Sequence, residues 1–171
     1  MSNGQHVSGI PLRAVAPNAI TVLALCFGLT GVRFAGGGEW RLAVGCIVVA
    51  GILDGMDGRI ARLLRANSKF GAELDSLSDN IAFGTAPALI LFLWSLRSAP
   101  SFGWTVALAL AVCCALRLAR FNARIDAGPQ PHKEAGFNTG VPAPVGAGLA
   151  FVPIYLWLIT GENRFRHWLA V

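Results

Sequence analysis

Residues 54–62 read DGMDGRIAR and residues 71–79 read GAELDSLSD. Five of the nine acidic residues of the chain fall in this window, which lies between long apolar runs. Acidic groups near the hydrocarbon of a bilayer are costly, and where they occur they mark functional sites. These two stretches therefore decide how the rest of the sequence is interpreted.

The composition around this window is that of a membrane protein. Hydrophobic residues make up 54% of the 171 residues and charged residues 13%, and the mean hydropathy is +0.58. A typical globular chain has about 25% charged residues. A chain of this length cannot hide so much apolar surface in a water-facing core, so we expect a single domain over residues 1–171 in a lipid bilayer.

The apolar runs predict an all-α, polytopic integral membrane fold, because a spanning helix needs about 20 mostly apolar residues. We expect five transmembrane helices and the start of a sixth that the chain does not complete. The basic, proline-rich stretch 120–140 is predicted to be a loop. The five expected spans are residues 17–32, 42–64, 72–96, 102–119 and 141–160, and the sixth starts at residue 165.

The distribution of basic residues predicts the topology. Most of the 14 lysines and arginines lie at the N-terminus and in the second and fourth loops. Cytoplasmic loops carry an excess of these residues, so we expect a multi-pass protein of the cell membrane whose N-terminus and aspartates face the cytoplasm. The basic residues form short clusters between apolar runs, so the net charge of +5 indicates contact with lipid headgroups and excludes a nucleic-acid partner.

The spacing of the aspartates predicts a metal site. Asp54 and Asp57 are three residues apart and Asp75 and Asp79 are four apart, so each pair shares one face of a helix. A short turn joins the two helices and brings both pairs to the same side of the membrane. Four converging carboxylates would repel one another unless one or two divalent cations lay between them. Oxygen ligands of this kind favour Mg²⁺ or Mn²⁺, often shared with substrate phosphates.

Small and basic residues beside the aspartates fit a phosphate-containing ligand. Gly58, Ala61 and Gly71 leave room for a ligand to approach the backbone, and Arg62 can pair with a phosphate. The alternative is a solvated helix hairpin in which the acids pair with nearby basic side chains, namely Arg59, Arg62, Arg65 and Lys69.

The spacing D-x2-D-G-x2-A-R-x8-G-x3-D-x3-D, from Asp54 to Asp79, resembles the motif of the CDP-alcohol phosphotransferase family at every fixed position. This resemblance implies a six-helix, homodimeric membrane fold with a site open to the cytoplasm. It implies two divalent metal ions on the four aspartates, with Asp79 also acting as the catalytic general base. The residues that it implies for the CDP part of the donor are Gly58, Ala61 and Arg62. We expect Gly71 and Asn18 to bind the CDP group as well. For Asn18, a role in starting the first helix is an equally good explanation.

Two further stretches, RLARFN at 117–122 and FNTGVPAP at 137–144, resemble the branch of that family that uses L-serine. The implied reaction transfers the phosphatidyl group of CDP-diacylglycerol to L-serine and releases CMP. Because the serine carboxylate needs a cation, Arg117, Arg120 and Asn122 are candidates for binding the acceptor. The same arginines would suit the phosphate of inositol phosphate, or would simply anchor the helix end at the headgroups. Val141 stands where the serine branch usually has leucine.

Two alternatives remain at this point. One is a transferase of the same family with another acceptor, inositol phosphate or glycerol phosphate. The other is a non-enzymatic divalent-cation membrane protein, whose acids would be spread over the depth of the bilayer on several helices. Clustering of the acids at one end of two neighbouring helices favours the enzyme. The sixth helix is at most a short stub, so the sequence is either truncated or that of a short member of the family. Either case puts the helix packing and the dimer contacts implied by the family in doubt.

Overall fold

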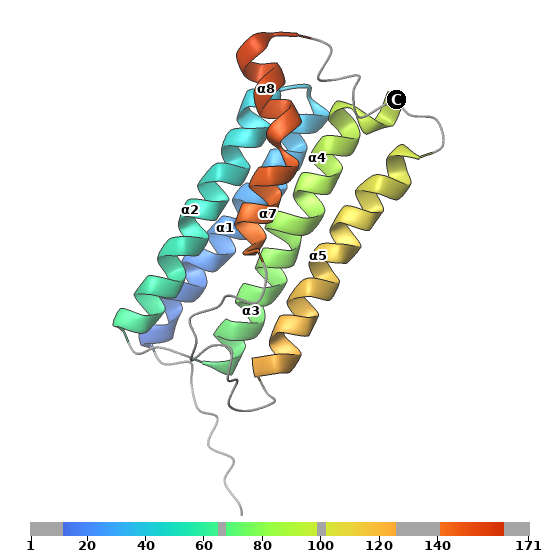
Figure 1. Ribbon diagram of the computed structural model, residues 1–171. Helices are drawn as coiled ribbons and strands as arrows, with labels where there is room; N and C mark the ends of the chain where they lie inside the picture. Colours follow the sequence, from blue (N-terminus) through green and yellow to red (C-terminus); the bar gives the residue numbers. More distant parts are fainter. Residues whose placement is uncertain (1–11, 65–67, 99–101, 126–140, 163–171) are drawn as a thin grey trace, which may run out of the picture.

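The computed structural model describes residues 12–64, 68–98, 102–125 and 141–162, and over these ranges the protein is entirely helical (Figure 1). Helices α1, α2 and α5 lie side by side with a rod formed by α3, η1 and α4, and α7 and α8 pack in front of them. The elements in chain order are α1 (Leu12–Gly36), α2 (Trp40–Leu63), α3 (Lys69–Asp79), the π-helical turn η1 (Asn80–Thr85), α4 (Ala86–Trp94), the 3₁₀ turn η2 (Leu96–Ser98), α5 (Gly103–Ile125), α7 (Ala143–Ala150) and α8 (Val152–Thr160).

Three helical segments are long and apolar enough to cross a bilayer, namely Val15–Gly36, Lys69–Trp94 and Gly103–Ala123. The pair α7 and α8, which is bent by 46°, makes a fourth candidate span if it is counted as one. Helix α2 lies beside α1, but its second half carries the charged residues of the acidic motif and is less apolar. The described part of the chain is thus a helical membrane protein with three or four candidate spans, and the expected five remain a prediction.

One predicted boundary is wrong. Helix α5 continues to Ile125, so the predicted loop at 120–140 begins too early. The basic and polar residues at this end suggested a loop, yet Arg120 is simply an exposed residue of the helix. The remainder of that loop and the predicted start of a sixth helix lie outside the described residues.

Close packing around α1 depends on small residues. A Cβ atom on Gly31 would lie 3.0 Å from the carbonyl oxygen of Ala43, and one on Gly28 would lie 2.9 Å from the Cα of Ala82. Small residues allow helix backbones to approach closely in a membrane, where packing rather than the hydrophobic effect holds helices together. Helix α1 is therefore fixed against α2, which carries Asp54 and Asp57, and against η1, which directly follows Asp79.

The largest buried side chains lie at the other end of the bundle. Ile90 and Trp94 of α4, together with Phe151 and Ile154, have at most 1% of their surface exposed. The rings of Trp94 and Trp157 lie 5.9 Å apart. These side chains belong to an apolar core that also includes buried residues of α1, α2, η1 and α7.

Candidate metal and nucleotide site

Three carboxylates from two helices converge at one end of the bundle. Asp54 and Asp57 lie in the second half of α2 and Asp75 lies on α3, and one oxygen of each lies within 4.8 Å of the others. The two helices therefore bring three of the four predicted aspartates together. Three carboxylate oxygens at this separation are a donor set that suits a hard divalent cation.

Asp79 takes a different position from the other three aspartates. It is the last residue of α3 and lies outside the group of three carboxylates. Its side chain lies within hydrogen-bonding reach of Asp54. The structure thus places the fourth predicted aspartate next to the cluster, in contact with one of its members.

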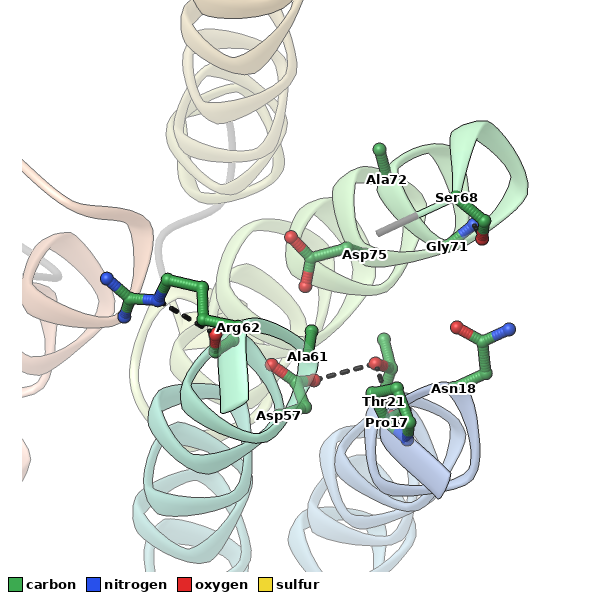
Figure 2. A pocket seen from close by; sticks show the side chains of 11 residues that line it. Pro17, Asn18, Thr21, Asp57, Ala61, Arg62, Ser68, Gly71, Ala72 and Asp75 are labelled. Atoms are coloured by element: carbon green, nitrogen blue, oxygen red, sulfur yellow. Dashed lines mark hydrogen bonds between the residues drawn. The ribbon is translucent and has the colours of Figure 1, made fainter. Parts of the chain in front are cut away.

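A pocket of about 330 Å³ opens beside the carboxylates (Figure 2). It lies between the start of α1, the end of α2 and the start of α3, and Asp57 and Asp75 form part of its wall. All five residues predicted to bind the CDP group line this pocket: Asn18, Gly58, Ala61, Arg62 and Gly71. The structure therefore brings together residues that are more than fifty positions apart in the sequence.

The small residues of the pocket serve two different purposes. A Cβ atom on Gly71 would lie 2.9 Å from Oδ1 of Asn18, so a larger residue there would displace the Asn18 side chain in the pocket wall. A Cβ atom on Gly58 would meet no atom of the described residues within 4 Å. The lack of a side chain at Gly58 therefore leaves open space beside Asp57, whereas at Gly71 it leaves room for the Asn18 side chain.

Arg62 is held by its own helix. Its Nε donates to the carbonyl oxygen of Gly58 at 3.0 Å, and in Figure 2 the guanidinium group extends away from Asp57 and Asn18. The group lines the pocket without pairing with Asp57. Phosphate recognition by Arg62 would require its side chain to turn toward the pocket.

Thr21 contacts the cluster directly, although it lies outside the acidic motif and was not among the predicted site residues. Its hydroxyl donates to Oδ2 of Asp57 at 2.7 Å, from α1 to α2. The hydroxyl of Ser78 donates in turn to the carbonyl oxygen of Thr21 at 3.2 Å. The available signal was a hydroxyl residue inside an apolar run, three positions after Asn18 and thus on the same helix face.

The three candidate acceptor residues lie on the second half of α5. Arg117 donates through Nη1 to the carbonyl oxygen of Val141, which precedes α7. Asn122 donates through Nδ2 to Oγ of Ser76 at 2.7 Å, and this joins α5 to the helix that carries Asp75. Arg120 is exposed on the same helix. Asn122 is thus the candidate that is tied to the aspartate-bearing helix.

The helices include three or four candidate membrane spans, and three carboxylates lie beside an open pocket at one end. These features define the class: a polytopic membrane protein whose clustered carboxylates could hold a divalent cation. The model of the CDP-alcohol phosphatidyltransferase family matches residues 14–171. The chain therefore belongs to this family, as the aspartate spacing predicted.

Curated relatives with the name CDP-diacylglycerol–serine O-phosphatidyltransferase are similar over most of this chain. The protein of Mycobacterium tuberculosis (strain H37Rv) is 50% identical over 133 residues, which are 78% of this chain and 46% of that protein. The Mycobacterium leprae protein is 48% identical over 133 residues, which are 78% of this chain and 44% of that protein. The protein of Helicobacter pylori (strain 26695) is 36% identical over 150 residues, covering 88% and 59%. The chain thus spans about half the length of these relatives, and no solved structure matches it.

Proposed function

We propose that this protein transfers the phosphatidyl group of CDP-diacylglycerol to L-serine, giving phosphatidylserine and CMP. The observation that carries the proposal is the cluster of Asp54, Asp57 and Asp75, within 4.8 Å of one another beside a pocket of about 330 Å³. The name shared by the relatives supports serine as the acceptor.

Two divalent cations, Mg²⁺ or Mn²⁺, are held by the four aspartates in this proposal. The donor set fits them, because its oxygens are carboxylates and lie close enough to repel one another without a cation. When bound, such cations neutralise the charge of the donor diphosphate and of the departing CMP. Asp54, Asp57 and Asp75 supply ligand oxygens from two helices, and Asp79 completes the set from its position beside Asp54.

The reaction makes one bond to phosphorus and breaks one. The serine hydroxyl oxygen bonds to the phosphorus that carries diacylglycerol, and the bond from that phosphorus to the bridging oxygen of the diphosphate breaks. The bridging oxygen leaves with CMP. Asp79 takes the proton of the serine hydroxyl, because a free alcohol is a poor nucleophile and a positioned carboxylate assists its attack.

The chain's other residues bind and orient the two substrates. The nucleotide lies in the pocket against Asn18, Gly58, Ala61 and Gly71, and Arg62 turns toward the diphosphate. Asn122, Arg117 and Arg120 hold the serine carboxylate from the end of α5. The bond from Asn122 to Ser76 supports this role, since it brings that end of α5 to the helix of Asp75.

The assembly that goes with this activity is a single domain over residues 1–171 in the cell membrane, with five spans and the start of a sixth. It forms a homodimer, and the aspartates face the cytoplasm, as the excess of basic residues on that side predicts. The four cysteines of the chain are first replaced by serine, and labelling of single cysteines then introduced at residues 64 and 37, from either side of the membrane, tests the orientation. Reaction of the cysteine at residue 64 from outside intact cells would contradict it.

Release of CMP from CDP-diacylglycerol tests the activity directly. The purified protein is assayed with Mn²⁺ or Mg²⁺ and with serine, inositol phosphate or glycerol phosphate as the acceptor, with Asp79→Asn as the control. We expect release with serine that is lost in the variant. Release with another of these alcohols would keep the family chemistry and change the acceptor, and no release from the folded protein would favour a non-enzymatic role.

A further inference from the structure

Thr21 contacts both of the helices that carry the aspartates. Its side chain has 6% of its surface exposed, and it lies on α1, outside the acidic motif. Its hydroxyl reaches Oδ2 of Asp57 on α2 at 2.7 Å, as Figure 2 shows, and its carbonyl oxygen accepts the hydroxyl of Ser78 on α3 at 3.2 Å. One residue of α1 therefore links a cluster carboxylate to the segment between Asp75 and Asp79.

The Thr21 hydroxyl has one proton and two acceptors within reach. These are Oδ2 of Asp57 at 2.7 Å and the carbonyl oxygen of Pro17 at 3.1 Å. A charged acceptor forms the shorter and stronger hydrogen bond. The proton therefore belongs to the bond with Asp57, and this bond restricts the orientation of the Asp57 carboxylate.

Burial makes this bond important for Asp57. Asp57 has 4% of its surface exposed although it lines the pocket, so few water molecules can take the place of a lost partner. A buried polar group that loses its partner bears the full cost of its desolvation. Partners of metal-binding side chains orient those ligands, and their loss typically lowers metal affinity by about 10- to 100-fold.

We propose that Thr21 is a positioning residue for the metal site: it orients Asp57 through its hydroxyl and sets α3 against α1 through its carbonyl oxygen. The proposal rests on the metal site of the proposed function. Thr21 acts through Asp57, and it takes no part in the bonds that are made and broken.

Mn²⁺ binding to the purified, detergent-solubilised protein tests this, with free Mn²⁺ measured by electron paramagnetic resonance so that no turnover is required. Thr21→Val keeps the shape of the side chain and removes the hydroxyl, and we expect it to weaken binding by about 10- to 100-fold. Thr21→Ser restores the hydroxyl and should restore binding. In the transfer assay, Thr21→Val should raise the Mn²⁺ concentration needed for half-maximal rate, while the rate at saturating Mn²⁺ approaches that of the unaltered protein.

Thr30→Val is the matched control. Thr30 lies on the same helix, and its hydroxyl donates to the carbonyl oxygen of Cys26 at 2.7 Å. Its removal should leave Mn²⁺ binding unchanged, which separates the effect on Asp57 from a general effect of losing a threonine hydroxyl in α1.

Equal Mn²⁺ affinity in Thr21→Val and the unaltered protein would overturn the proposal for Thr21 and leave the metal site intact. Failure of the unaltered protein to bind Mn²⁺ would instead remove the metal site and this proposal with it. If Thr21→Val does not fold, Thr21→Cys gives the same test, because a thiol is a weak donor. Unchanged affinity in the cysteine variant would equally overturn the proposal.

Discussion

The two halves of α2 differ in what they bury. The first half buries apolar side chains, among them Ala43, Ile47 and Ala50, whereas over residues 52–63 the buried residue is Asp57. The glycines near these two halves differ in the same way. Gly31 of α1 packs against the Ala43 carbonyl in the first half, but a Cβ on Gly58 in the second half would meet nothing among the described residues within 4 Å. A single helix is thus filled at one end and open at the other.

Small residues therefore have two different roles along one membrane helix. Where a neighbouring backbone lies within van der Waals distance, a small residue serves packing, and enlarging it costs stability. Where space is open beside a carboxylate, a small residue serves a ligand, and enlarging it should affect binding. The predictions below test this division, starting with the largest expected effect.

Asp75→Asn removes one charge from the cluster while keeping the size of the side chain. We expect kcat/KM for CMP release to fall by about 100- to 1,000-fold, because stabilisation of the charge on the transferring phosphoryl group is lost. Mn²⁺ binding by electron paramagnetic resonance should weaken in parallel. Full activity in this variant would show that the reaction does not need the Asp75 carboxylate, and so that α3 and the open half of α2 do not share a metal site.

Ala50→Leu places a larger side chain in the filled half of α2. Ala50 has no exposed surface, so we expect overpacking to cost about 1–3 kcal/mol of unfolding free energy. Thermal unfolding in detergent, followed by circular dichroism, measures this loss. Mn²⁺ affinity of the folded fraction should stay unchanged, and a selective loss of metal binding would contradict the division of the helix.

Asn122→Ala tests whether the end of α5 binds the acceptor. We expect KM for serine to rise about 10-fold, as for the loss of a hydrogen bond to a charged group, with KM for the donor unchanged. Ser76→Ala is the matched variant, because it removes the same bond between α5 and α3 without touching the acceptor. If Asn122 only links the two helices, both variants will show the same serine KM.

Gly58→Ala should have the smallest effect on stability. The added methyl group enters open space, and alanine favours a helix over glycine, so we expect the unfolding free energy to stay the same or rise by up to about 1 kcal/mol. KM for CDP-diacylglycerol should rise, since Gly58 lines the pocket. A marked drop in the unfolding temperature would show that Gly58 serves packing after all.

The lengths of the apolar runs predicted where helices lie in the described part of the chain, but local chemistry shifted their ends. The third helix was expected from residue 72, whereas α3 starts at Lys69, because the Ser68 hydroxyl accepts from the backbone N–H of Gly71 at 3.0 Å and caps the helix. The predicted span 141–160 is two helices bent by 46°. Pro153 explains the bend, since it lacks an N–H and its ring collides with the carbonyl four residues earlier.

The aspartate cluster could be predicted because its spacings are local. Asp54 and Asp57 share a helix turn, and the short connection to α3 leaves few ways to place Asp75. The partner of Asp57 could not be predicted in this way. Thr21 is 36 positions away, and its contact depends on how α1 packs against α2, which no spacing within the motif encodes.

The π turn η1 begins directly after Asp79 and joins a polar helix to an apolar one. A π turn is equivalent to one residue inserted into a regular helix, and each helical residue turns the chain by about 100°. The two helices of the rod are therefore offset in phase, so that the aspartate face of α3 and the buried face of α4 need not lie in line. Deleting one residue of η1 would give α3 and α4 the same helical phase. The rod could then place either the aspartates at the pocket or the buried side chains of α4 in the core, but not both.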